Sequence, residues 1–198
     1  LLQTKDLWLQ KLPWHLWDFL ERYPNAEIAL STPSYEQVNR SLPESTAVKI
    51  LAILGNSDGI DTKTDRKILE QLPQADTTFL VEPECKDLTN QLWEQNWQIL
   101  FFAGHSSSQE SCDTGNIYIN QTESLTIGQL KYALKKAVER GLQLAIFNSC
   151  DGLGLAREFA DLQIPQIIIM REPVPDKVAQ EFLKYFLEAM IRGESLYL

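Results

Sequence analysis

Hydrophobic residues gather in five short runs in which apolar positions follow one another almost without alternation. The runs are Val48–Leu54, Thr77–Val81, Gln98–Ala103, Gln143–Asn148 and Gln166–Met170. Strands of a parallel sheet that is covered on both faces have this nearly continuous apolar character. The pattern therefore predicts five buried, mostly parallel strands.

Between and after these runs, apolar residues recur at helical spacing. The predicted helices are Thr62–Gln71, Lys86–Asn96, Thr126–Arg140, Leu153–Leu162 and Pro175–Arg192. Strands and helices alternate along the chain, which favours an open, doubly wound α/β sheet.

Two stretches depart from this alternation. The region from His105 to Thr126 is serine-rich and then carries two short apolar segments, so we expect a flexible polar loop followed by a small hairpin insertion. Residues 1–45 are rich in tryptophan and proline, and we interpret them as an N-terminal packing segment and linker. Residues 46–198 then form the main domain. Because the chain begins with Leu-Leu-Gln and stops within a helix-like stretch, we expect it to be a fragment of a longer protein.

Composition and charge exclude several classes of function. The formal net charge of -9 repels a nucleic-acid backbone, and no lysine- or arginine-rich run offsets it. An acidic surface favours a basic protein partner, although solvation alone also explains surplus acid. No apolar run approaches the roughly 18 residues that span a bilayer. The three cysteines form no close pair, which indicates free thiols in a reducing compartment, the cytoplasm.

The two strongest candidates for catalytic residues each follow one of the predicted strands. His105 comes after Gly104 at the end of one strand, and Cys150 comes after Ser149 at the end of another. Parallel strands end at the same edge of a sheet, so the two side chains can meet if these strands are neighbours. The alternative is that Cys150 is a small buried hydrophobic residue and His105 an ordinary loop histidine.

Cys150 also stands where its thiolate can be stabilised. A thiol with a pKa near 8.5 becomes nucleophilic when an imidazole or a helix N-terminus lowers that pKa. Cys150 precedes a predicted helix, and Gly152 and Gly154 allow the backbone amides between them to turn toward an oxyanion.

Several motifs resemble one known family. Phe101–Ser106 (FFAGHS) resembles the histidine motif of CHAT proteins, and Ile146–Gly152 (IFNSCDG) resembles their cysteine motif, in the caspase-hemoglobinase clan. Leu12–Trp17, Asn25–Leu30 and Ile50–Asn56 are also similar to CHAT sequence, so the resemblance covers almost the whole chain.

The resemblance implies a bacterial, caspase-like protein with a three-layer fold. It implies that His105 is the general base or imidazolium partner and Cys150 the nucleophile that forms a thioacyl intermediate. The backbone N–H of Cys150, with that of Gly104 or Ser106, would form the oxyanion hole. Many relatives have glycine where Ser106 stands, so this position departs from the pattern.

The resemblance says less about the substrate side chain. Relatives that cleave after arginine or lysine often have an aspartate where this chain has the neutral Asn148. Asp151 or Asp113 are candidates for the missing charge, although a capping or turn role is the more common one for an aspartate in either position. We predict Asn148, Asp151 and Asp113 as substrate-binding residues.

Other chemistry has little support. A zinc or redox role for His105, Cys112 and Cys150 lacks a fourth ligand and a metal-binding spacing. Gly55–Gly59 lacks the ending of a phosphate loop and is read as a tight turn. His15 lies in an apolar segment and is read as a packed side chain. We predict neither a metal nor a cofactor.

Three functions remain open. The first is a cysteine endopeptidase that cleaves a specific protein or peptide partner under the control of other domains of the same polypeptide. The second is a catalytically silent domain for signalling and interaction. The third is a cysteine-dependent hydrolase or acyl transferase for small molecules, which would require a deep apolar pocket beside Cys150.

Overall fold

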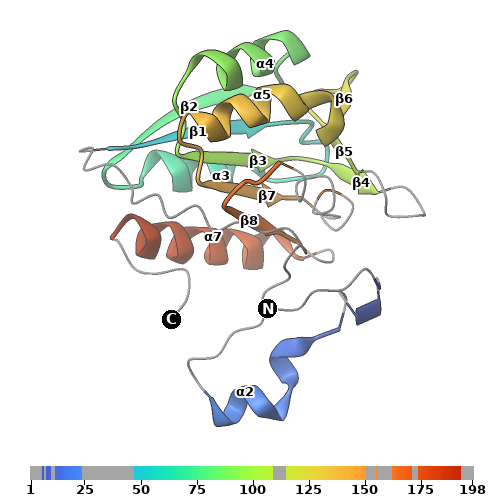
Figure 1. Cartoon of the computed structure of the whole chain (residues 1–198), viewed down its shortest axis with the longest axis vertical. Coiled ribbons are helices and arrows are strands. Elements are labelled where there is room, and N and C mark those ends of the chain that lie inside the picture. The colour runs from blue at the N-terminus through green and yellow to red at the C-terminus, as the bar shows by residue number, and fades with distance from the viewer. Residues whose placement is uncertain are drawn as a thin grey trace.

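A five-stranded parallel sheet forms the centre of the molecule (Figure 1). The structure is a computed structural model of the 198-residue chain, and it describes residues 6, 8–9, 12–23, 47–108, 115–149, 155, 162–170 and 174–192. The strands are β1 (Val48–Leu54), β2 (Ala75–Val81), β3 (Ile99–Ala103), β7 (Leu144–Asn148) and β8 (Gln166–Ile169). Their order in the sheet is β2-β1-β3-β7-β8, and every neighbouring pair is parallel. The predicted parallel sheet is confirmed.

Helices cover both faces of this sheet, as Figure 1 shows. Helices α4 (Cys85–Glu94) and α5 (Ile127–Glu139) lie on one face, and α3 (Thr62–Glu70) and α7 (Asp176–Ile191) lie on the other. Side chains alternate along each strand between two separate hydrophobic clusters, one under each helical layer. This is the α/β caspase-like three-layer arrangement.

The two central strands explain why the apolar runs do not alternate. All five residues of β3 are buried, and so are the last five of β1. Leu51 and Phe102 point into the cluster beneath α4 and α5, whereas Ile50 and Phe101 point into the cluster beneath α3 and α7. Both faces of a strand in this position require apolar side chains.

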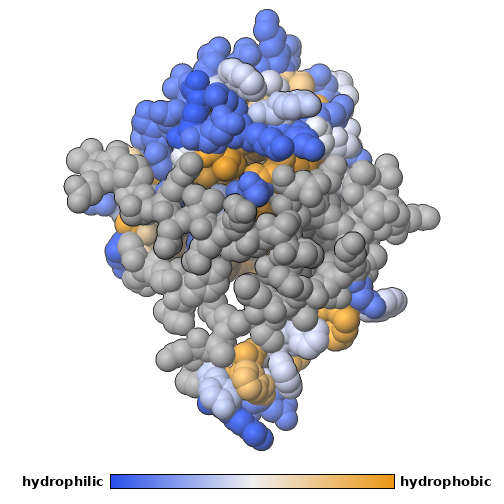
Figure 2. All heavy atoms as spheres, viewed as in Figure 1, coloured by the Kyte–Doolittle hydropathy of each residue, from blue (hydrophilic) through white to orange (hydrophobic). Residues whose placement is uncertain are grey.

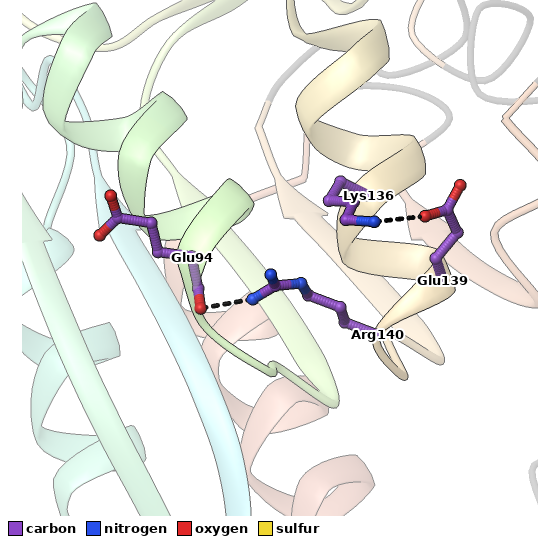
Figure 3. A network of polar contacts seen from close by, with 4 residues as sticks. All are labelled: Glu94, Lys136, Glu139 and Arg140. Carbon is purple, nitrogen blue, oxygen red and sulfur yellow. Dashed lines mark hydrogen bonds and ion pairs between the residues drawn. The ribbon is translucent and has the colours of Figure 1, made fainter.

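Capping residues and short polar contacts fix the helices. Thr126 and Gln129 form a capping box at the start of α5. At the other end of α5, the Arg140 guanidinium donates a hydrogen bond to the Glu94 carbonyl at the end of α4, and Lys136 pairs with Glu139 at 2.9 Å (Figure 3). The Arg140 contact links the two helices of this layer.

A second, smaller sheet lies beyond the end of β3 (Figure 1). It consists of β4 (Ser106–Ser108), β5 (Gly115–Tyr118) and β6 (Ser124–Thr126), paired antiparallel in that order. The predicted hairpin corresponds to β5 and β6. The prediction of a polar loop was wrong for Ser106–Ser108, which pair with β5 through their backbone, a contact that needs no apolar side chain.

The N-terminal segment carries exposed aromatic residues. It contains a 3₁₀ turn, η1 (Trp14–Leu16), and a short helix, α2 (Asp18–Arg22). The Phe19 ring contacts those of Trp17 and Tyr23, and all three side chains are about half exposed. Figure 2 shows hydrophobic residues at this end of the view and hydrophilic residues over α4 at the other end. The side chain of His15 lies outside what the structure describes, as do residues 24–46, so the division at residue 45 stays a prediction.

Candidate active site

The strands that precede His105 and Cys150 are direct neighbours. β3 and β7 pair in a register that places Ala103 opposite Asn148. His105 follows Ala103 by two residues, and Cys150 follows Asn148 by two residues. The condition that the sequence set for a His105–Cys150 pair is therefore met. Cys150 itself lies outside the described residues, so the contact between the two side chains stays a prediction.

His105 is held by the connection that follows β1. Its ring Nε2 lies 2.6 Å from the carbonyl oxygen of Asp58. A carbonyl oxygen only accepts hydrogen bonds, so Nε2 carries a hydrogen and donates it. The other ring nitrogen, Nδ1, is then the one that is able to accept a hydrogen bond from a neighbouring group.

The backbone of His105 is fixed on both sides. Its N–H donates to the Asn56 carbonyl at 3.2 Å, and its own carbonyl accepts from the Tyr118 N–H at 3.0 Å. The Asn56 side chain in turn accepts the Asp58 N–H at 3.0 Å, which shapes the turn that carries the Asp58 carbonyl. His105 is thus positioned by the β1–α3 connection and by β5.

Two glycines permit this close approach of three backbone segments. A Cβ at Gly55 would lie 2.3 Å from the Tyr118 carbonyl oxygen. A Cβ at Gly104 would lie 3.0 Å from the Phe102 ring and 3.2 Å from the Gly55 Cα. Side chains at these positions would push apart the segments that hold His105.

Of the predicted oxyanion donors, Gly104 and Ser106 are described and Cys150 is not. The His105 N–H between them is already used by Asn56. Ser106 lies opposite Ile117, and the bond from Tyr118 N–H to the His105 carbonyl makes this a non-hydrogen-bonded pair of the ladder. The pairing with β5 therefore does not use the Ser106 N–H. The oxyanion hole stays a prediction.

A small pocket opens beside the two residues that precede Cys150. Its volume is about 20 Å³. Its polar lining comes from α3, the end of β7 and α7, namely Asp65, Asn148, Ser149, Asp176 and Gln180. Its apolar wall comprises Ile60, Met170 and Val174. The pocket thus adjoins the strand end from which Cys150 follows.

The most buried polar side chain of this pocket is Asp65, which is 1% exposed. It accepts a hydrogen bond from the Asn148 side-chain amide at 3.2 Å. Burial, reinforced by the negative charges of Asp176 and Asp61, raises the pKa of Asp65 to about 7, and the Asn148 bond opposes that rise. Near neutral pH this carboxyl therefore gains and loses a proton.

Asp61 joins the helix starts on this side of the sheet. It caps α3, and hydrogen bonds from the side chain and backbone of Thr64 hold its pKa below the ordinary value. Its backbone N–H donates to Asp176 at 3.2 Å, and its carbonyl accepts from the Gln180 side chain at 3.1 Å. The starts of α3 and α7 are thereby tied together around the pocket.

The predicted substrate-binding residues have different outcomes. Asn148 lines the pocket, where it contacts Asp65. Asp113 and Asp151 lie outside the described residues, as does Cys112, so their roles remain predictions.

Sequence reasoning missed Asp58, Asp65 and Asp176. Asp58 acts through its backbone and leaves no side-chain signal. Asp65 did leave one, because it shares the buried face of α3 with Leu69, four residues on. An acidic residue on the apolar face of a helix is a reason to look for a site.

The described residues show no group of three or more histidine, cysteine, aspartate or glutamate side chains able to hold a metal ion. Within the same residues, no helix is both long and apolar enough to cross a bilayer. The described cysteine, Cys85, has a free thiol.

Comparison with protein families gives one result. The model of the CHAT domain family matches residues 1–198, which is the whole chain. A search among curated proteins found no match.

Proposed function

The chain belongs to the CHAT domain family of caspase-like proteins, and from this premise we propose that it is a cysteine endopeptidase domain in which His105 and Cys150 form the catalytic dyad. The substrate is a specific protein or peptide, and other domains of the same polypeptide control its cleavage. The three cysteines, which form no close pair in the sequence, support a reducing compartment, the bacterial cytoplasm.

The observation that carries this proposal is the pairing of β3 with β7. In their register Ala103 lies opposite Asn148, and each candidate follows two residues later on neighbouring parallel strands. The anchored Nε2 of His105 adds a second support, because it leaves Nδ1 as the proton-exchanging nitrogen. A histidine held by a carbonyl in this way has one defined role toward a thiol.

The proposed reaction proceeds in two stages. The Cys150 thiol passes its proton to Nδ1 of His105, and the thiolate attacks the substrate carbonyl carbon. Backbone N–H groups of Cys150 and of Gly104 or Ser106 stabilise the resulting oxyanion. The C–N bond breaks, the amine takes the proton from His105, and a thioester to Cys150 remains. Water, deprotonated by Nδ1, then releases the acid and restores the thiol.

The test is the pH dependence of Cys150 alkylation by iodoacetamide, read at each cysteine by mass spectrometry. We expect Cys150 to react with an apparent pKa well below 8.5, because an adjacent imidazolium stabilises its thiolate. A His105→Ala variant should lose that shift. Cys85 provides the internal control, since it lies on α4 and should react alike in both proteins.

Ordinary thiol behaviour of Cys150 in both proteins would contradict the dyad and favour the catalytically silent signalling domain. A Cys150→Ala variant supplies the complementary test. It should fold as the parent does and cleave nothing.

A further inference from the structure

Helix α7 is apolar on two sides. It belongs to the outer layer on one side of the sheet (Figure 1), and its inner side packs into the hydrophobic cluster on that face. On its outer side Val178, Phe182 and Tyr185 are 57%, 44% and 59% exposed. A surface helix ordinarily has one apolar and one polar side, so an apolar outer side indicates that something packs there.

These three residues form one continuous line, which we call the α7 stripe. They are spaced by four and then three positions, so they lie above one another along the helix. The Phe182 ring stacks on the Phe186 ring, with 5.4 Å between the ring centroids. The Lys184 ammonium lies 5.1 Å from the centroid of the Tyr185 ring. Both aromatic side chains of the stripe therefore have defined neighbours on their own helix.

Charged side chains of alternating sign follow one flank of the α7 stripe. In chain order they are Lys177, Glu181, Lys184 and Glu188. The first three each precede a stripe residue by one position, and the fourth continues the same spacing, so all four lie about 100° around the helix from the stripe. The salt bridges among the described residues lie on α3 and α5. None of these four charges is therefore paired with another described residue.

The charged flank is complementary to itself when a second copy is turned round. In a two-fold symmetric pair, a residue that faces a second residue of the other copy is faced by that second residue in return. An antiparallel pair of α7 helices that crosses near Phe182 places the charged flanks of both copies side by side. Lys177 then lies opposite Glu188 of the other copy, and Glu181 lies opposite Lys184. Each charge thereby gains a partner of opposite sign.

We propose that α7 pairs antiparallel with α7 of a second copy of this chain, so that the protein forms a two-fold symmetric dimer. The two Phe182 rings meet near the two-fold axis, and Val178 of each copy packs near Tyr185 of the other. The pairing involves neither His105 nor Cys150, so its failure would leave the proposed function untouched.

The size of the contact sets the strength of the dimer. A helix of 16 residues is about 24 Å long. One pair of such helices buries less than the roughly 1,200 Å² at which stable protein interfaces begin. Both copies also carry a net charge of -9, and their repulsion weakens the dimer at low salt. We therefore expect a weak dimer with a dissociation constant in the micromolar range.

The first experiment is sedimentation velocity of the full chain from about 5 µM to about 500 µM, with a reducing agent that prevents disulfides between copies. We expect the mass to rise from that of a monomer toward that of a dimer across this range. A monomer at every concentration would overturn the proposal.

Charge variants test the antiparallel pairing itself. Glu181→Lys places lysine opposite lysine at two symmetric points of the interface, so the affinity of the dimer should fall by about tenfold. Lys184→Glu places glutamate opposite glutamate and should have the same effect. An equal mixture of the two variants restores opposite charges at both points, so the mixture should associate about as tightly as the parent chain. A mixture that associates no better than either variant alone would refute this pairing.

Matched controls separate this pairing from the effect of net charge. Glu94→Lys and Lys86→Glu make the same two charge changes at exposed positions of α4, on the other face of the sheet. Each should leave the affinity of the dimer within about twofold of the parent, because one charge in a distant position changes the repulsion between copies only slightly. Equal losses of affinity in these controls would contradict a role for the α7 flank.

A last pair of variants tests for a different occupant of the α7 stripe. Phe182→Gln should abolish the dimer, whereas Trp93→Gln, at a similarly exposed position of α4, should leave it intact. The N-terminal residues Trp8, Trp17 and Phe19 are also exposed and apolar, and they belong to the same chain. If the chain stays monomeric and Phe182→Gln lowers its free energy of unfolding in urea more than Trp93→Gln does, the chain covers its own stripe and the proposal fails.

Discussion

The Asp65 carboxyl lies in surroundings that oppose its ionisation. It is almost completely buried, and its charged neighbours Asp61 and Asp176 are also acidic. The Asn148 amide is its hydrogen-bond donor among the described side chains. A side chain of this kind lowers the stability of the fold at neutral pH, and proteins retain such costs mainly at functional sites.

This cost predicts how stability depends on pH. The pKa of Asp65 is about 7 in the folded chain against 3.8 ordinarily, so the folded state holds its proton more tightly. The contribution of this group to the free energy of unfolding is therefore full below about pH 4 and is lost as the pH rises to 7. At pH 8 the loss amounts to about 4 kcal/mol at most.

Asp65→Asn keeps the oxygen that accepts from Asn148 but cannot ionise. We expect the variant to match the parent near pH 4 and to be more stable at pH 8, as measured by urea unfolding at both values. Asp87→Asn makes the same change at an exposed first-turn position of α4 and serves as the control, because it should lower stability at pH 8 by at most about 1 kcal/mol. A variant less stable than the parent at pH 8 would show that the charge of Asp65 is compensated inside the fold.

At the scale of elements, the β1–α3 connection has the largest part in positioning His105. It provides the Asn56 carbonyl for the histidine backbone and the Asp58 carbonyl for the ring. Gly55 lies where this connection passes against Tyr118, with no room for a side chain.

Gly55→Ala should therefore displace the histidine. Its Cβ would meet the Tyr118 carbonyl at 2.3 Å, and backbone does not yield as a side-chain tip does. We expect a loss of stability and of the lowered Cys150 pKa, measured by unfolding and by iodoacetamide labelling.

Gly59→Ala is the matched control in the same connection. It meets no atom within 4 Å, but its φ of 75° costs an alanine about 1–2 kcal/mol. It should lower stability by that amount and leave the Cys150 pKa in place. An unchanged Cys150 pKa in Gly55→Ala would show that this pKa does not depend on how the β1–α3 connection positions His105.

The elements that the sequence predicted are those with a strong apolar signal. β1 and β3 are buried on both faces, so their apolar runs gave their bounds to within a residue. β4 consists of three serines and is held by backbone pairing and by a contact between the Ser107 and Tyr118 hydroxyls, so no apolar pattern indicated it. The role of the Asp58 carbonyl could not be predicted from the sequence either, since every residue has a backbone carbonyl.

At the scale of the whole molecule, the strand order places the site. From β1 the chain goes to one side to form β2, and from β3 it goes to the other side to form β7 and β8. The connections after β1 and β3 begin next to each other at the carboxyl edge of the sheet, where open α/β folds place their ligands. Asp58 and His105 come from these two connections, so the fold itself brings the carbonyl to the ring.

The net charge acts on this edge of the sheet from a distance. A charge of -9, with carboxylates concentrated beside β7, should repel anions that approach Cys150. Iodoacetate and iodoacetamide are nearly equal in size but only iodoacetate is charged. We expect Cys150 to react more slowly with iodoacetate, by up to about tenfold relative to the chain unfolded in urea.

Salt distinguishes this long-range field from local charges. The Debye length falls from about 30 Å at 0.01 M to about 3 Å at 1 M. Added sodium chloride should therefore remove most of the difference between the Cys150 labelling rates of the two reagents. Asp65→Asn removes one of many charges and should change this difference in labelling rate only slightly. Faster labelling by iodoacetate would show instead that the His105 imidazolium beside the cysteine outweighs the acidic body of the protein.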